Sequence, residues 1–575
     1  MKVLTTRNAN ITLIIFGLFS SLHAMKMQIK MNTLVFLGLF FAFFYAFAVG
    51  KGIVWADSGA DQCVPREAAH VGGRIVRASL ADATTLLPPL ATDEASFDIM
   101  NQVYVALVRY DKDLNLVDWA ARSHEVIENG TAIQFTLRDD IRWTDGTPLT
   151  VADVQFTYKC MIDPKTPTAY AEDFLNVASL EQTGPWSFVV RYKEVRADSL
   201  ATWAFPILPA HLLEGTNITK STLGRKPIGA GPFVLSSWKT GRHIVLRANP
   251  DYFLGRPYID EAVIRVIPDD ATMFLELSAG NIDVMTLSPL QYMRQTSGPA
   301  WDRKFVKMRY LDASYIYLAY NQKHPFFKDV RVRRAIAHAV DKREIIKGVL
   351  LGQGVPARGP YMPGTWMYNT RIQDYDYNPE KARALLAEAG FVDTDGDGIV
   401  EQDGRPFVFT ILVNQGNMRR AKIAAIIQYR LAFVGIRVTV RTVEWAAFIK
   451  NFVNTGRFDA VVLGWNILPD PDIFDVWHSS KIDGGLNFIA FNDPELDQLL
   501  ETGRTTLDRS ERKRMYDRVQ VILHEKQPYL FLYVPYALPI VSSRIKNVCP
   551  APAGIDYNFD RWWVSAPDNT QALQK

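Results

Sequence analysis

The stretch from Gln134 to Tyr158, QFTLRDDIRWTDGTPLTVADVQFTY, contains a strand, a turn and a helix start in direct succession. Apolar residues alternate with polar ones over 133–137, which is the period-2 pattern of a half-buried strand. Thr144–Thr147 (TDGT) supplies turn chemistry, because glycine tolerates positive φ and aspartate can bond its own backbone. Thr150, followed three residues later by Asp153, is typical of a capped helix start. The stretch therefore predicts a strand–turn–helix unit of a mixed α/β protein.

The same stretch resembles the segment WxDGxPLTAxDVxFxY of the bacterial solute-binding proteins of family 5, the peptide and nickel class. Other segments resemble further motifs of that family in the same order, namely Pro227–Phe233, Arg247–Phe253, Gly280–Val284, Tyr315–Asn321 and Asn487–Asp497. The resemblance extends from about Arg74 to about Val564. It implies an α/β periplasmic binding protein fold with two lobes, an extra subdomain in the first lobe and a hinge between them.

At 575 residues the chain is too long for a single core, so several domains are expected. We predict a signal sequence or anchor at 1–56, a short tail at 57–71, lobe 1 at 72–311, lobe 2 at 312–526 and a return to lobe 1 at 527–575. The extra subdomain is expected at about 100–225. Two elements are predicted within these limits: a helix over Phe97–Tyr110, and a strand at Tyr529–Tyr533 that returns to lobe 1.

The N-terminus predicts export from the cytoplasm. Thr33–Val49 is an apolar run preceded by Lys26 and Lys30, and Val54–Ala56 has small residues suited to cleavage before Asp57. The alternative is an uncleaved membrane anchor, because the 17 residues of this run approach the roughly 20 that span a bilayer. Either way, we expect a periplasmic or cell-envelope protein.

Charge and cysteine content narrow the range of partners. Residues 1–56 hold five basic and no acidic residues, so the formal charge of +3 becomes −2 once they are removed. The sequence contains no block of lysine or arginine residues, so it does not indicate nucleic acid or anionic lipid as a partner. Cys63, Cys160 and Cys549 permit one disulfide, whose pairing the sequence leaves open, and the residues before Cys63 do not indicate a lipid anchor.

The candidate ligand site centres on Gly464–Asp472 (GWNILPDPD). In peptide-binding members of the family, the loop after the GW pair places an acid against the peptide's free α-ammonium. Here Ile467 and Leu468 occupy that place, so Asp470 or Asp472 is predicted to substitute, or the ligand differs. The residues predicted to bind ligand are Tyr104, Tyr320, Asn321, Trp465, Asn466, Ile467, Leu468, Asp470, Asp472 and Asn487. For Tyr104 and Trp465 a packing role is the alternative.

Asp393–Glu401 (DTDGDGIVE) has the spacing of a calcium loop, with acids at its first, third and fifth positions and glycine at the sixth. The twelfth position, which closes an EF-hand loop, is Gly404 rather than Glu. A structural calcium held by Asp393, Asp395, Asp397 and Glu401 is therefore one hypothesis, and an acidic turn before a strand is the other.

The resemblance implies the periplasmic substrate-binding component of an ABC importer. Such a protein captures short peptides in the cleft between its lobes and, as a monomer, delivers them to permease subunits in the inner membrane. Oligosaccharides and nickel complexes are the alternative ligands within the family. No GxSxG, HExxH or GxxxxGK[ST] motif occurs, so we expect no enzymatic activity. A secreted hydrolase is the hypothesis from another class, and turnover of a bound compound would distinguish it.

Overall fold

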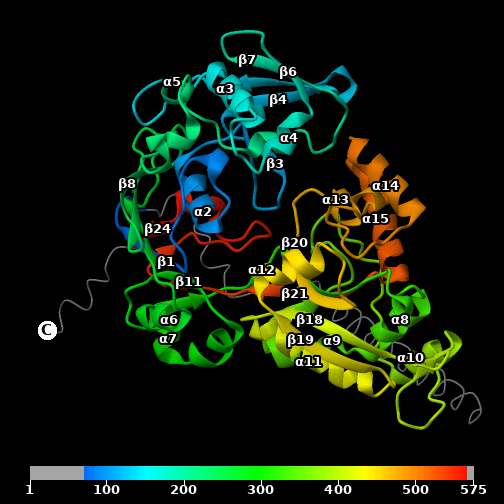
Figure 1. Ribbon diagram of the computed structural model, residues 1–575. Coiled ribbons are helices and arrows are strands. Elements are labelled where there is room, and N and C mark those ends of the chain that lie inside the picture. Colours follow the sequence, from blue (N-terminus) through cyan, green and yellow to red (C-terminus); the bar gives the residue numbers. More distant parts are fainter. Residues whose placement is uncertain (1–69, 566–575) are drawn as a thin grey trace, which may run out of the picture. The chain divides into compact units, whose positions relative to one another are not determined.

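The computed structural model describes residues 70–565, in which strands form two seven-stranded sheets and a four-stranded sheet (Figure 1). The first large sheet runs in the order β12 (Phe305–Lys307), β22 (Pro539–Ser542), β11 (Val284–Thr286), β1 (Arg74–Ser79), β10 (Glu261–Val266), β9 (His243–Ala248), β8 (Phe233–Lys239). The four-stranded sheet is β4 (Ala121–Ile127), β5 (Ala132–Leu137), β7 (Ser187–Tyr192), β6 (Val177–Gln182). One hydrophobic core joins these two sheets, and we call this part the first lobe.

The second large sheet defines the second lobe. Its order is β13 (Tyr310–Leu311), β21 (Tyr529–Ala537), β14 (Ser314–Tyr320), β20 (Ala460–Asn466), β18 (Val408–Asn414), β19 (Arg437–Val443), and β15 (Gly354–Pro356) also pairs with β21. Two further hydrophobic cores cover its faces. Three strand pairs lie outside the larger sheets: β2 (Val108–Tyr110) with β3 (Leu116–Asp118), β16 (Glu401–Gln402) with β17 (Arg405–Pro406), and β23 (Ile545–Lys546) with β24 (Trp563–Val564). The expected two-lobed α/β fold is confirmed.

Helices pack on these sheets. Those of the first lobe are α2 (Glu94–Val103), α3 (Val151–Ile162), α4 (Ala171–Leu175), α5 (Ala210–Leu213), α6 (Asp270–Ser278) and α7 (Pro299–Lys304). Those of the second lobe are α8 (Val330–Ala339), α9 (Lys342–Leu350), α10 (Pro379–Glu388), α11 (Met418–Ala432), α12 (Trp445–Ala447), α13 (Phe474–Trp477), α14 (Pro494–Thr505) and α15 (Arg509–Lys526). In Figure 1, α11 lies along β18 and β19, where apolar residues of the helix and the strands share one core.

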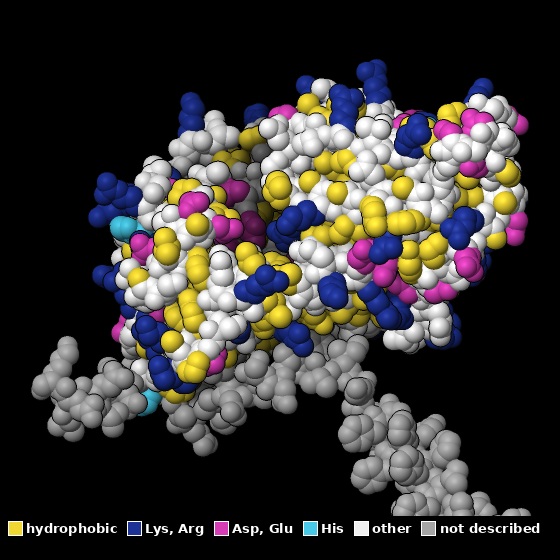
Figure 2. Space-filling model, turned by 90° about the horizontal axis from the view of Figure 1, so that it is seen from below, with side chains coloured by type: hydrophobic (Ala, Val, Ile, Leu, Met, Phe, Trp, Pro, Cys, Tyr) yellow, Lys and Arg dark blue, Asp and Glu magenta, His cyan; other side chains and the backbone are white. Residues whose placement is uncertain are grey.

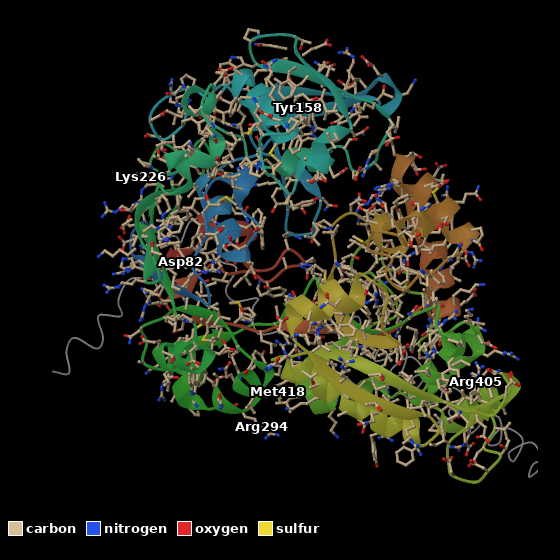
Figure 3. The ribbon with its side chains drawn as sticks, in the orientation of Figure 1. Asp82, Tyr158, Lys226, Arg294, Arg405 and Met418 are labelled. Carbon is tan, nitrogen blue, oxygen red and sulfur yellow. The ribbon has the colours of Figure 1, made fainter. Side chains whose placement is uncertain are left out.

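The predicted strand–turn–helix unit is confirmed. Its strand is β5, the inner strand between β4 and β7, and its helix is α3. Thr150 and Asp153 form a reciprocal capping box at the start of α3. The turn contains Gly146 at φ 91°, and the Thr147 N–H donates to the Asp145 carboxylate at 3.0 Å. Figure 3 labels Tyr158 on α3, whose hydroxyl donates to the carbonyl of Val177 on β6.

Two neighbouring segments carry the chain between the large sheets. One runs from β12 to β13 and the other from β21 to β22. They are joined by hydrogen bonds from Met308 N–H to the Pro539 carbonyl and from Asp312 N–H to the Pro535 carbonyl, both at 2.9 Å. Because both crossings lie side by side, rotation of one lobe on the other requires dihedral changes in only a few residues.

Two expectations about individual elements are wrong. The helix expected over Phe97–Tyr110 ends at Val103, because Val108–Tyr110 pairs with β3 instead. The strand β21 was expected to return to the first lobe, but it pairs with β14 and β15 in the second sheet. Its residues from Tyr529 to Val534 are all buried, which suits a strand in the interior of a sheet. The chain re-enters the first sheet only at β22.

Several other features bear on the N-terminal and charge predictions. The predicted signal or anchor and Cys63 lie outside the described residues. Cys160 is a buried free thiol, whereas Cys549 is disulfide-bonded. Between residues 70 and 565, we find no helix with the length and hydropathy needed to cross a membrane. On the face shown in Figure 2, basic and acidic side chains are interspersed.

Candidate functional site

Part of the predicted ligand site lies at the end of β20 and in the loop that follows it. Trp465 is half-buried and stacks on a tyrosine of β14, with 6.5 Å between the ring centroids. Asn466 is exposed, and the N–H of Ile467 donates to the carbonyl of Ala313 at 2.7 Å. Leu468 is 64% exposed, so the apolar residues that replace the family's acid do not all contribute to a core.

Asp470 and Asp472 already have arginine partners. The Arg512 guanidinium donates two hydrogen bonds to Asp470, at 2.9 and 2.7 Å. Arg504 donates to Asp472 at 2.9 Å, and Arg196 lies 3.8 Å from the same carboxylate. Burial raises the pKa of Asp472, while Arg504 acts in the opposite direction. Since arginines neutralise both carboxylates, a ligand ammonium would have to share either acid with its arginine, and the role predicted for these acids stays a prediction.

Four other predicted ligand residues lie inside the lobes. Tyr104, Tyr320, Asn321 and Asn487 are 1, 0, 8 and 0% exposed. The Tyr104 hydroxyl donates to a backbone carbonyl at 3.0 Å. The two asparagine amides also donate to backbone carbonyls, at 2.8–3.3 Å. Burial favours a packing role for these four residues, although the buried Tyr320 hydroxyl has no hydrogen-bond partner; that they bind ligand stays a prediction.

The two lobes contact each other at several places, three of which involve the β2–β3 hairpin, the segment at Arg196–Ala197 and Gly130. Leu114, at the tip of the β2–β3 hairpin, packs against a core of the second lobe. Ala197 N–H donates to the carbonyl of Arg504 at 2.8 Å, beside the contact of Arg196 with Asp472. Gly130 faces Leu507 so closely that a Cβ on the glycine would lie 2.3 Å from the leucine side chain. The structure therefore represents a state in which the lobes are in contact.

A cavity of about 640 Å³ lies beside these contacts, and we call it the interlobe cavity. It lies within the range of about 300–1,000 Å³ that small-molecule sites occupy. Residues of both lobes line it: Glu172, Asp173, Arg196 and Asp198 from the first, and Asp475, Lys481, Leu486 and Arg504 from the second. A ligand held here would contact both lobes at once.

A second cavity of about 390 Å³ lies in the first lobe, and we call it the Asp98 cavity. Its polar wall is formed by Asp98, Asn101 and Gln102 of α2. The helix is reached from β1 through a loop held by Asp82, labelled in Figure 3, which accepts hydrogen bonds from the Trp238 indole and the Gly241 N–H at 3.0 and 2.8 Å. Sequence reasoning missed this cavity, although polar residues at positions i, i+3 and i+4 share one helix face.

Three of the four acids predicted to hold calcium come together. Asp393, Asp395 and Glu401 offer carboxylate oxygens that lie within 4.8 Å of one another. Asp397 does not belong to this group: it accepts the Ile399 N–H at 2.7 Å and lies 3.7 Å from Arg437. Asp393 also accepts the N–H groups of two loop glycines at 2.8 and 3.0 Å, which orders the loop.

Comparisons with known proteins find that the chain is similar to solute-binding proteins. The family model for bacterial extracellular solute-binding proteins, family 5 Middle, matches residues 115–484. The oligopeptide-binding protein AppA of Bacillus subtilis is 34% identical over 503 residues, which cover 86% of this chain and 92% of that protein. Heme-binding protein A of Haemophilus influenzae is 28% identical over 502 residues, or 82% of this chain and 88% of that one.

Solved structures agree with these matches. The structure of AppA from Bacillus subtilis in complex with a nonapeptide has a TM-score of 0.71 at 33% identity, covering 87% of this chain and 100% of AppA. NikZ from Campylobacter jejuni, solved in complex with Ni(L-His), has a TM-score of 0.71 at 26% identity over the same shares of the two chains.

Proposed function

Because the chain belongs to the bacterial extracellular solute-binding proteins of family 5, we propose that it is the substrate-binding component of an ABC importer. It captures short peptides between its lobes and delivers them to permease subunits in the inner membrane. Peptides are the first choice of ligand because the oligopeptide-binding protein AppA covers nearly the whole described chain. We further propose that the protein is exported through its N-terminal segment, acts as a monomer and binds its ligand without converting it.

The observation that carries this proposal is the cavity lined by both lobes beside their contacts. A ligand in the interlobe cavity gains interactions with the second lobe only when the lobes meet. Closure then follows ligand binding, because a ligand shifts a two-state equilibrium by its differential affinity for the two states. The adjacent crossings between the sheets supply the hinge that such a closure needs.

Native mass spectrometry of the protein exported by a secreting bacterial host tests the function. Co-purified ligand is released by denaturation and identified. A heterogeneous set of short peptides is the expected result. A nickel complex, which the resemblance to NikZ favours as the second candidate, or a sugar would replace the peptide proposal. Conversion of the released compound by the purified protein would establish an enzyme instead.

We expect replacement of Arg196 by alanine to weaken closure. Arg196 contributes a charge across the lobes to Asp472 at 3.8 Å and is itself held by Asp198 at 2.5 Å. Because Arg504 still neutralises Asp472, we expect the variant to fold normally. Ligand dissociation should accelerate by about threefold with little change in association, measured by stopped-flow fluorescence. The control is Arg191→Ala, whose partners Glu128 and Glu181 lie within the first lobe. Equal dissociation rates in wild type and Arg196→Ala would contradict this role.

We also propose that the acidic loop at Asp393–Glu401 binds calcium weakly. With a Kd of about 1 mM, about 10 mM calcium would add about 1.4 kcal/mol to the free energy of unfolding. Differential scanning calorimetry should therefore show a higher midpoint with calcium than with a chelator. The shift should disappear in Asp395→Asn, because that residue supplies one of the three clustered carboxylates. A shift of the same size in the variant would assign the effect to another site.

A further inference from the structure

The Asp98 cavity carries an excess of negative charge. Its charged lining residues are the carboxylates Asp98, Asp556 and Asp560 and the guanidiniums Arg77 and Arg109. Three acids and two bases line the cavity, so its lining carries one more negative than positive charge. A cavity of this kind favours a ligand that brings a positive group.

Asp98 makes no close contact with either of the two bases. Arg77 and Asp556 form a two-bond ion pair, with both nitrogen–oxygen distances at 2.9 Å, so their charges satisfy each other. Arg109 is among the groups that act on Asp560. Among the described residues, Asp98 makes no hydrogen bond and no ion pair. The residue is exposed, but the protein around its carboxylate displaces water, and this desolvation raises its pKa to about 6 despite the nearby Arg77.

The other walls of the cavity suit an organic cation. Tyr110 and Tyr557 line it with aromatic rings, as do Phe559 and Trp119, over which the guanidiniums of Arg77 and Arg109 already lie at 5.4 and 5.1 Å from the ring centroids. Aromatic faces attract ammonium and guanidinium groups, more strongly where water is excluded. Asn101 and Gln102 add amide oxygens that can accept hydrogen bonds from such a group.

The cavity also adjoins the junction of the lobes. Tyr110 and Leu114 line it, and Leu114 packs against a core of the second lobe. The charges of Asp470 and Asp198 act on Tyr110, which places its hydroxyl near the loop after β20. A ligand held between the lobes can therefore reach Asp98 with one end or one side chain.

We propose that Asp98 binds the cationic group of the transported ligand, either the α-ammonium or a basic side chain of a peptide. The proposal rests on the peptide-binding function above. In this proposal, the ligand's cation is recognised by α2 of the first lobe. Asp470 and Asp472 do not take this role, because each is paired with its own arginine.

Isothermal titration with three kinds of synthetic alanine–serine peptides tests the proposal and identifies the source of the cation. The first kind has a free N-terminus, the second is N-acetylated, and the third is N-acetylated with one lysine. At about pH 8, Asp98→Asn should weaken binding of the cation-bearing peptides by about tenfold or more, because a charge-assisted hydrogen bond is lost. Peptides without a cation should bind both proteins equally. A loss restricted to the first kind identifies the α-ammonium, and a loss restricted to the third identifies a basic side chain.

Glu94→Gln is the matched control, because Glu94 is an exposed acid in the first turn of the same helix and does not line the cavity. It should leave all affinities within about twofold of wild type. If wild type binds the peptides and Asp98→Asn binds them equally well, the proposal is overturned while the peptide function stands. If wild type binds none of the peptides, the peptide function itself fails and the proposal falls with it.

A pH series supplies a second readout. The bound cation requires a charged Asp98, so affinity is full above the pKa of about 6 and falls as the pH drops below it. Arg77, Asp556 and Glu94 are the other charged groups that act on Asp98, and all three remain in the variant. In wild type, the affinity for cation-bearing peptides should fall by about fivefold between about pH 6 and pH 5, as the charged fraction of Asp98 decreases. Asp98→Asn should remove this decline; the same decline in both proteins would contradict the proposal.

Discussion

Replacing Gly229 with alanine should lower the free energy of unfolding by about 3 kcal/mol or more. A Cβ at this position would lie 1.9 Å from the carbonyl oxygen of Val103, at the end of α2. That oxygen accepts a hydrogen bond from the Gly231 N–H at 2.8 Å, and the Gly229 carbonyl accepts one from Thr144 at 2.9 Å. A methyl group must therefore displace backbone on both sides, and neither side can move without breaking a buried hydrogen bond.

Urea unfolding followed by circular dichroism measures this effect. The matched control is Gly184→Ala, because a Cβ there meets only the Ser187 side chain, at 3.7 Å or beyond. We expect that control to stay within about 0.5 kcal/mol of wild type. If the two variants unfold at the same urea concentration, the loop before β8 adjusts to the added methyl group without a loss in the free energy of unfolding. Since Val103 directly follows Gln102 of the Asp98 cavity, Gly229→Ala should also weaken ligand binding.

Removing the Arg512 side chain should strongly destabilise the second lobe. Arg512, whose side chain is 7% exposed, holds Asp470 with two hydrogen bonds and the Gly503 carbonyl with a third at 3.0 Å. In Arg512→Ala, Asp470 becomes a largely buried carboxylate without a cation. Breaking a buried pair on one side costs about 3–5 kcal/mol, and the partial exposure of Asp470 favours the lower limit.

Arg514→Ala is the control, because Arg514 lies on the same helix with its side chain 71% exposed and its partner Glu511 at 3.6 Å. It should cost less than about 0.5 kcal/mol. The double replacement of Asp470 and Arg512 should recover part of the loss, because no unpaired charge then remains. If Arg512→Ala unfolds at the same urea concentration as Arg514→Ala, the pair does not stabilise the loop.

The sequence indicated where the predicted loop lies relative to the lobes, but not which charges its acids meet. The loop Gly464–Asp472 does lie where the lobes meet, because Asp472 contacts Arg196 of the first lobe. Its two acids, however, face arginines that come 42 and 32 residues later in the chain. On α2, Tyr104 was chosen and Asp98 was not. The sequence shows an acid in the middle of this helix and a tyrosine at its end, but not which of the two faces a cavity.

The sequence by itself determined the local units and the family. Alternation over 133–137 and the capping pair Thr150 and Asp153 produce β5 and α3 from contacts between near neighbours, which any observer of the sequence can identify. Only the tertiary structure decided which charges are satisfied. Arg77 and Asp556 are 479 residues apart, yet Arg77 gives both of its hydrogen bonds to Asp556, and Asp98 is left without a hydrogen bond or ion pair among the described residues. Burial and charge pairing depend on contacts between segments that are distant in the sequence. Periodicity along the chain does not indicate which of these segments come into contact.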